Sequence, residues 1–164
     1  MANIQIKEVE MKVVVQRVKS AKIIIDEKEE RQIGEGLFLL VGVAEGDDIS
    51  EADMLAQKCS ELRIFDDENG DLNLSAENLQ KDILIVSNFT LYANTKKGRR
   101  PSFIKAARPP LAVDCYEAFI AAMKKRDIGK VETGEFGAYM EITAVNDGPV
   151  TIIIDPAEWA KKEE

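Results

Sequence analysis

The chain has 164 residues, of which 45% are hydrophobic and 32% charged, and its net charge is −8. This length fits one domain, and the composition is that of an ordinary soluble globular protein rather than a disordered one. No apolar run approaches the roughly 20 residues of a membrane-spanning helix, and the first residues lack the pattern of a secretory signal, so we expect a cytoplasmic protein.

The chain is expected to begin with an extension and a pair of strands. Residues 1–10 alternate only weakly and are predicted to be an N-terminal extension to one domain that spans residues 11–164. Residues 12–18 and 21–25 are β-branched runs separated by two polar residues. This pattern predicts a hairpin or a pair of strands.

The next predicted elements are a charged turn, a buried strand and a helix. Residues 27–31 form the turn, and residues 36–43 are a continuous apolar run typical of a central strand covered on both faces. A capping-box spacing at residues 48–51 precedes apolar residues at helical period, which predicts a helix over residues 50–64. The acidic cluster within residues 66–70 lacks EF-hand spacing, and this segment is predicted to be a solvated turn.

The second half of the chain continues this alternation. Residues 82–87 are predicted to be a buried strand, which residues 88–91 continue to its carboxyl end. A Pro-Pro pair opens a helix that ends near Arg126. Residues 139–145 and 150–154 are predicted to be two strands of a hairpin, because Asp-Gly between strands is a strong turn signal. A short amphipathic tail closes the chain.

The order of these elements indicates the fold class. Strands, helix, strand, helix and strands in succession predict an α/β protein. We expect a single domain with mixed β-sheets in a layered or barrel-like arrangement and helices packed on one side.

The sequence contains no histidine. Ser-His-Asp and Cys-His catalysis are therefore excluded, as is a histidine general base near neutral pH. Cys59 and Cys115 lie far apart without CxxC spacing, so they are expected to be small buried hydrophobic residues rather than zinc ligands. We predict no metal site and no cofactor. Any enzyme chemistry must use carboxylates, Lys, Tyr, backbone donors or groups of the substrate.

A cationic stretch interrupts the acidic chain. Between Asp82 and Asp114 there are six Lys and Arg residues and no acidic residue. Such a loop suits local contact with phosphate, because the field near the loop matters more than the total charge. A solvated loop that faces an acidic patch fits the pattern equally well. The candidate contacts to phosphate are Lys96, Lys97, Arg99 and Arg100.

Two polar segments are candidates for a site. Ser87, Asn88, Phe89 and Thr90 lie where a buried strand ends, so their hydroxyl, amide and backbone groups can polarise a carbonyl. No neighbouring base activates either hydroxyl as a nucleophile. The alternative is that these groups satisfy one another's hydrogen bonds at a strand end. The second segment contains Gly148-Pro149, which by pattern alone is an ordinary trans turn.

Five blocks of sequence carry a resemblance. They are MKVVVQRV from Met11, GLFLLVGV from Gly36, LRIFDDENGDLNLS from Leu62, SNFTLYANTKKGRRPSF from Ser87, and VETGEFGAYMEITAVNDGPVT from Val131. In this order they resemble the D-aminoacyl-tRNA deacylase family. The resemblance extends to about residue 155 and implies an ester hydrolase that acts on D-aminoacyl-tRNA and on glycyl-tRNA, so the expected partner is aminoacyl-tRNA.

The resemblance also implies roles for residues. It implies a homodimer in which Gly148 and Pro149, as a Gly-cisPro element, enter the pocket of the neighbouring subunit. The two carbonyls would hold the amino group of a D-residue, and an L side chain would collide with them. Arg17 matches the arginine that orients this element. The expected pocket residues are Phe136, Met140 and Asn146.

The resemblance accounts for the missing histidine. The 2′-hydroxyl of the terminal ribose is expected to assist, with main-chain amides around Phe89 and Thr90 polarising the ester carbonyl. The family motif usually reads Ser-Gln-Phe-Thr-Leu, whereas this chain has Asn88, whose side chain is one methylene shorter. Two alternatives stay open: a tRNA-binding module without deacylase activity, and a related editing deacylase for small L-amino acids.

Overall fold

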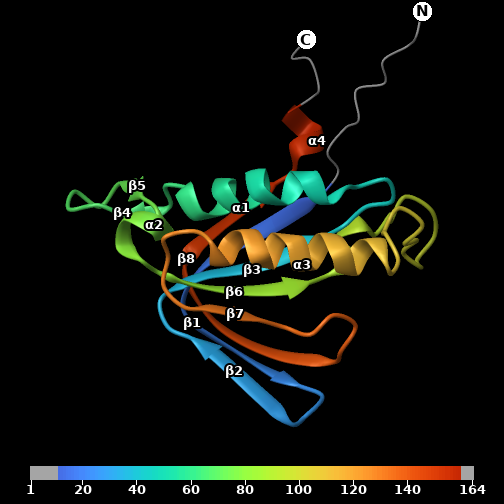
Figure 1. Ribbon diagram of the computed structural model, residues 1–164, viewed down its shortest axis with the longest axis horizontal. Helices are drawn as coiled ribbons and strands as arrows, with labels where there is room; N and C mark the ends of the chain where they lie inside the picture. Colours follow the sequence, from blue (N-terminus) through green and yellow to red (C-terminus); the bar gives the residue numbers. More distant parts are fainter. Residues whose placement is uncertain (1–10, 160–164) are drawn as a thin grey trace, which may run out of the picture.

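The first strand, β1 (Lys12–Ile25), organises the sheet in the computed structural model, which describes residues 11–159 (Figure 1). One edge of β1 pairs with β8 (Met140–Ile154) over most of its length. The other edge pairs first with β3 (Gly36–Gly42) and then with β2 (Glu29–Ile33). All three partners run antiparallel to β1, and the pairing with β8 joins the first strand of the described chain to the last.

The sheet curls into a nearly closed barrel. Beyond β3, the strands β6 (Asp82–Ser87) and β7 (Val131–Thr133) are added in parallel. The Nη1 of Arg31 in β2 donates to the main-chain oxygen of Thr133 in β7 at 2.7 Å, which joins the two sides of the curl. Inside it lies a small apolar core made of Val18, Ala21, Ile23, Ile25, Ile33, Phe38, Leu84 and Val86. The barrel-like arrangement is therefore confirmed.

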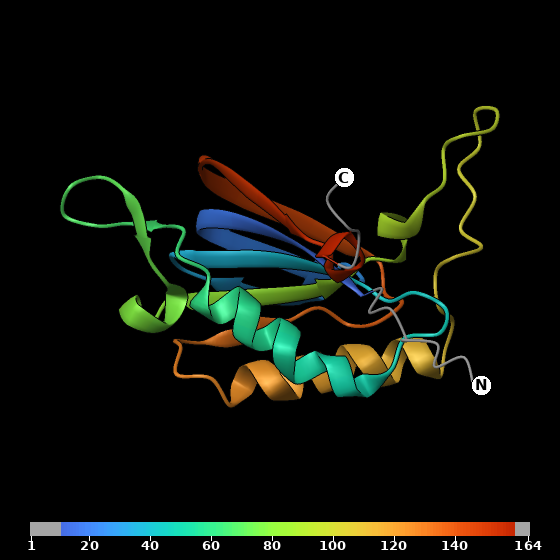
Figure 2. The same cartoon turned by 90° about the horizontal axis from the view of Figure 1, so that it is seen from above.

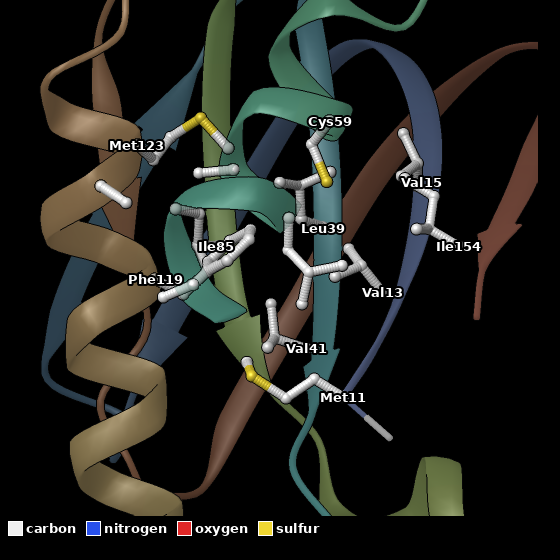
Figure 3. Close-up of a cluster of buried hydrophobic side chains, with 14 of the residues drawn as sticks. Met11, Val13, Val15, Leu39, Val41, Cys59, Ile85, Phe119, Met123 and Ile154 are labelled. Carbon is white, nitrogen blue, oxygen red and sulfur yellow. The ribbon is translucent and has the colours of Figure 1, made fainter. Parts of the chain in front are cut away.

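Two helices cover the outer face of the sheet, on the side away from the small core inside the curl. α1 (Ala52–Glu61), which follows the 3-10 turn η1 (Ile49–Glu51), and α3 (Leu111–Lys124) lie side by side there (Figures 1 and 2). The main apolar core fills the space between helices and sheet, because alternate strand residues point toward the helices (Figure 3). Its labelled members are Met11, Val13, Val15, Leu39, Val41, Cys59, Ile85, Phe119, Met123 and Ile154.

Both cysteines are buried in this core, as predicted. Burial raises the pKa of the Cys59 thiol to about 12. Burial also raises the pKa of Cys115 to about 11, with a further contribution from nearby carboxylates such as Asp47. Both side chains are therefore neutral at physiological pH and act as hydrophobic residues.

The remaining elements are short. They are β4 (Phe65–Asp66), β5 (Leu72–Leu74), α2 (Ala76–Leu79), the 3-10 helix η2 (Phe89–Tyr92) and α4 (Pro156–Trp159). Among residues 11–159, no helix combines the length and the apolar character that crossing a bilayer requires. The predicted extension, residues 1–10, and the end of the predicted tail lie outside the described residues.

The predicted buried strands at 36–43 and 82–87 and the two predicted helices are confirmed, but the first hairpin is wrong. Residues 12–18 and 21–25 belong to one continuous strand, whose register against β8 shifts between Gln16 and Ser20. The chain bends there instead of turning. The charged turn is also shorter than predicted, because Asp26 and Glu27 adopt positive φ angles of 49° and 62° and Glu29 already pairs with β1.

The predicted hairpin near the carboxyl end is wrong as well. Residues 139–145 and 150–154 do not face each other; from Met140 on they form β8. Both halves pair with β1, so the turn signal of Asp147-Gly148 is overridden by ladder hydrogen bonds on either side of it. The Gly148-Pro149 peptide bond is cis, in contrast to the trans turn that the pattern alone indicates.

Candidate active site

A cavity of about 220 Å³ opens where β6 ends. It is lined by Val41, Val43, Ser87, Asn88, Phe89, Ala107, Ala112, Phe136, Gly137, Ala138 and Met140. The structure thus brings three of the predicted catalytic residues together with two of the predicted pocket residues. None of these described lining side chains is ionisable, so the groups that they offer inside are a hydroxyl, an amide and main-chain donors.

Asn88 ends the strand and begins a helix. Its main-chain N–H donates to the Val41 carbonyl at 2.8 Å, while its side-chain Oδ1 accepts from the Thr90 N–H at 3.1 Å and from the Thr90 hydroxyl. A side chain that accepts from the N–H two residues on is a typical N-cap. The prediction that residues 88–91 continue the strand is therefore wrong: the cap turns the chain into η2 instead.

The main-chain amides of Phe89 and Thr90 differ in their availability. The Thr90 N–H donates to Asn88, whereas the Phe89 N–H, at the start of η2, has no hydrogen-bond acceptor within the described part of the chain. Phe89 also lines the cavity. The residue is 57% exposed, and its ring meets the Phe103 ring edge-on, with centroids 5.1 Å apart. A free donor at the cavity is thus flanked by an aromatic pair.

Tyr116 and Gly134, which the sequence analysis did not assign to a site, support the lining residues Phe136 and Met140. The Tyr116 ring packs against the Phe136 ring at 6.1 Å, and its hydroxyl donates to the Ile85 carbonyl at 3.0 Å. Burial raises the pKa of Tyr116, so this hydroxyl stays protonated. Gly134 leaves room for Met140, because a Cβ there would lie 2.5 Å from the Met140 sulfur. Tyr116 is indistinguishable by spacing from its core neighbours on α3.

The residues predicted to set chirality do not line this cavity. Gln16 and Val18 pair with Thr151 and Asn146, so the four residues between these two partners bulge out of β8 opposite Arg17. We call residues 147–150 the Gly-Pro bulge. Gly148 and Pro149 are exposed in it. Asn146, predicted as a pocket residue, is likewise exposed on β8 and outside the cavity of its own chain.

The buried side chain of Arg17 fixes the Gly-Pro bulge through its contacts with Asp147. This side chain is only 8% exposed. Nε donates to the Asp147 carbonyl at 3.0 Å, and Nη1 donates to the Ile64 carbonyl at 3.0 Å. Ion pairs to Asp147 and Asp66 complete the set.

The predicted phosphate contacts lie on a projecting loop. Asn94 and Ser102 exchange two main-chain hydrogen bonds, of 2.8 and 2.9 Å, and clasp the base of a hairpin that we call the basic arm, residues 94–102. The arm extends away from the sheet (Figure 2). The four exposed cations on it are Lys96, Lys97, Arg99 and Arg100.

Metal ligands do not gather in the described structure. Over residues 11–159, no group of three or more Asp, Glu or Cys side chains is placed to hold an ion. Residues 67–70 of the predicted acidic turn do form a turn, in which the Gly70 N–H donates to the Asp67 carbonyl at 3.0 Å.

Comparison with known proteins identifies the family. A family model described as D-Tyr-tRNA(Tyr) deacylase matches residues 14–155. The chain belongs to this family. A D-aminoacyl-tRNA deacylase of Thermosipho africanus (strain TCF52B) is 49% identical over 145 residues, which cover 88% of this chain and 97% of that protein. One of Geobacillus sp. (strain WCH70) is 48% identical over 150 residues, covering 92% and 98%.

Two solved structures share the fold. A protein described as c-Myc DNA unwinding element binding protein superimposes with a TM-score of 0.80 at 36% identity, covering 88% of this chain and 97% of that one. A probable eukaryotic D-amino acid tRNA deacylase superimposes with a TM-score of 0.78 over 90% of this chain and all of that one. The latter is 16% identical and bears on the fold alone.

Proposed function

We propose that the protein hydrolyses the ester bond between tRNA and a D-amino acid or glycine, releasing free tRNA and the amino acid. Membership of the deacylase family supports the reaction class. The observation that carries the proposal is a cavity at a strand end. Among the residues that the structure describes, it has no ionisable side chain in its lining, and the main-chain N–H of Phe89 beside it has no acceptor. Such a site stabilises charge on a carbonyl oxygen instead of transferring protons through side chains.

The chemistry then divides between the main chain and the substrate. The Phe89 N–H donates to the ester carbonyl oxygen and holds the negative charge that forms when water adds to the carbonyl carbon. One donor of this kind contributes roughly 10²–10³ in rate. The bond between the carbonyl carbon and the ribose oxygen breaks, and this leaving oxygen gains the proton that water loses, with the neighbouring 2′-hydroxyl assisting. Thr90 is not the nucleophile, because its hydroxyl donates to an amide oxygen, which is no base.

Chirality is set by the Gly-Pro bulge of a second subunit. Gly148 and Pro149 are exposed and do not line the cavity of their own chain, so they are available to a neighbouring one. Their carbonyls accept from the amino group of a D-residue, while the same position leaves no room for an L side chain. Glycine has no side chain and is admitted. Arg17 holds the bulge in place for this role.

The free edge of β8 supports a homodimer. In the described chain β8 pairs only with β1, which leaves its other edge open for a partner. Ile142, Val145 and Ile153 of this strand are exposed by 38, 50 and 66%. Unpaired strand edges and exposed apolar side chains are features that a symmetric partner covers. Sedimentation velocity tests this point: we expect a dimer, and a charged substitution such as Ile153→Lys should shift it toward monomer.

The basic arm supplies contacts to tRNA phosphates. It carries four exposed cations on a chain whose net charge is −8, so it offers a local positive field. We place the reaction in the cytoplasm, where aminoacyl-tRNA is used.

Hydrolysis of matched esters tests the function. The purified protein is incubated separately with D-Tyr-tRNA, L-Tyr-tRNA, Gly-tRNA and L-Ala-tRNA, and the remaining ester is measured over time. We expect the D-ester and the glycyl ester to be cleaved and the L-ester to persist. Equal rates for the two tyrosyl esters would contradict chiral selection. Salt-sensitive tRNA binding without cleavage of any ester would instead favour a binding module. Cleavage of L-Ala-tRNA would favour the editing deacylase for small L-amino acids.

A further inference from the structure

A second cavity lies beyond the other end of η2. It has a volume of about 460 Å³, and its lining includes three lysines from separate parts of the chain: Lys12 at the start of β1, Lys96 on the basic arm and Lys105 after it. We call it the lysine groove. Figure 2 shows α4, in red, beside the yellow-green turn of η2 at the base of the arm, and residues of both elements line the groove.

The lysine groove has a defined shape without a ligand. The Lys12 Nζ lies 3.7 Å from Asp155 Oδ2 and 4.8 Å from the centre of the Tyr92 ring, so its half-buried side chain is held in one direction. The Lys96 N–H donates to Asn94 Oδ1 at 2.9 Å. The Lys105 carbonyl accepts from the Glu45 N–H at 2.9 Å. The backbones that carry the two exposed lysines are therefore anchored.

The charge and the surface of the groove favour one class of ligand. Among the described residues of the lining, three lysines outnumber one carboxylate, Asp155, and the lining also includes an aromatic ring and hydroxyl and amide groups. Phosphodiesters of single-stranded RNA match this mixture, because cations contact the backbone while the nucleosides lie against apolar and polar surface. An acidic peptide would match the lysines, but it has no nucleoside to lie against the Tyr92 ring.

The position of the groove relates it to the candidate active site. Phe89, at the start of η2, lines the smaller cavity, while Leu91 and Tyr92, at its end, line the lysine groove. We propose that the lysine groove binds the phosphodiester backbone of the unpaired nucleotides that precede the terminal adenosine of the substrate. This proposal rests on the proposed function, since it assigns that function a second subsite.

Binding of RNA tests the groove independently of hydrolysis. The probe is a short 5′-fluorescein-labelled RNA that ends in ACCA, followed by fluorescence anisotropy. We expect Lys96→Gln with Lys105→Gln to weaken binding roughly three- to tenfold and to reduce the salt dependence of log Kd, by about 0.7 for each phosphate that the protein no longer neutralises. The matched control, Lys124→Gln with Lys125→Gln, removes the same charge at the far end of α3 and should bind normally (Figure 1). Equal weakening in both double variants would overturn the proposal.

Lys12 is tested separately because it also pairs with Asp155. Lys12→Gln should weaken binding of the RNA, and Lys12→Arg, which keeps the charge, should restore it; failure of arginine to restore binding would overturn this part. At matched ionic strength, inorganic phosphate should displace the RNA only weakly. Full displacement would mark the groove as a site for a free anion and would overturn the RNA assignment.

Hydrolysis separates this proposal from the proposed function. With D-Tyr-tRNA, the Lys96/Lys105 double variant should raise KM and leave kcat within about twofold. With 3′-O-(D-tyrosyl)adenosine, which lacks the preceding phosphates, its kcat/KM should match that of the parent. An equal loss on both substrates would overturn the groove assignment. If the parent protein cleaves neither ester, the proposed function fails, and the RNA-binding comparison still decides the groove.

Discussion

Arg17 and Asp147 are joined at the point where β1 and β8 lose register. The Nε of Arg17 donates to the Asp147 carbonyl at 3.0 Å and lies 3.5 Å from its Oδ2. Because the same guanidinium reaches Ile64 and Asp66, one buried side chain connects the Gly-Pro bulge to the loop that follows α1. An exposed surface segment is thereby held by a buried side chain.

Replacing the Arg17 guanidinium should therefore change the stability of the protein and the position of the Gly-Pro bulge. Arg17→Lys retains the charge but loses the planar fork that reaches several acceptors. We expect a loss of about 1–3 kcal/mol in the free energy of unfolding, measured in urea, since buried carbonyls lose their donors. The ratio of D-Tyr-tRNA to L-Tyr-tRNA hydrolysis should also fall. Asp66→Asn is the control, because the Asp66 side chain is 56% exposed and loss of its charge should cost little. A variant with full D/L discrimination would show that the bulge does not depend on Arg17.

Gly148→Ala should distort the Gly-Pro bulge without affecting the core. Gly148 has a φ of 151°, and a Cβ would lie 2.3 Å from the Val150 nitrogen, so the backbone must shift. We expect discrimination between the tyrosyl esters to fall, while the far-UV circular dichroism stays unchanged. Gly70→Ala is the matched control, because it also has a positive φ of 80° but open space around it and a position in the acidic turn. Unchanged selectivity in Gly148→Ala would argue against the proposed role of the bulge.

The cap formed by Asn88 predicts different effects for two substitutions. Asn88→Ala removes the acceptor for the Thr90 N–H and should cost roughly 0.5–2 kcal/mol of stability, with a lower kcat. Asn88→Asp keeps an acceptor and should preserve stability, yet its negative charge at the cavity should lower kcat by opposing an oxyanion. Thermal unfolding and single-turnover hydrolysis measure the two effects. An aspartate variant with the parent kcat would contradict oxyanion stabilisation at this position.

The buried thiols predict a loss of stability at alkaline pH. The folded-state pKa values of about 12 for Cys59 and about 11 for Cys115 lie above the value of about 8.5 of an unfolded chain. The neutral thiols therefore contribute their full stabilisation below about pH 8.5, and this contribution is lost as the pH rises toward 11 and 12. Urea unfolding between pH 8 and 11 measures the trend. Cys59→Ala should show a shallower decline; an equally steep one would assign the effect to other groups. Ellman's reagent should not label the native protein at pH 8.

Much of the fold follows from local sequence. The apolar run at residues 36–43 predicts β3, and the periodic apolar residues predict α1 and α3. The spacing of apolar residues shows whether an element buries one face or both. The missing histidine is a matter of composition alone, and it excludes the usual hydrolytic machinery. The block resemblance locates the two segments that the proposed function uses.

Only the tertiary structure decided how these segments are presented. Asp147-Gly148 is a turn signal, yet the chain continues as β8, because β1 offers ladder hydrogen bonds on both sides of it. The anchor of the resulting bulge, Arg17, lies 130 residues away from Asp147. Lys12 and Lys105 are also far apart in the sequence, yet they line one groove. Local sequence determines which residues are buried, whereas long-range pairing determines which exposed groups meet.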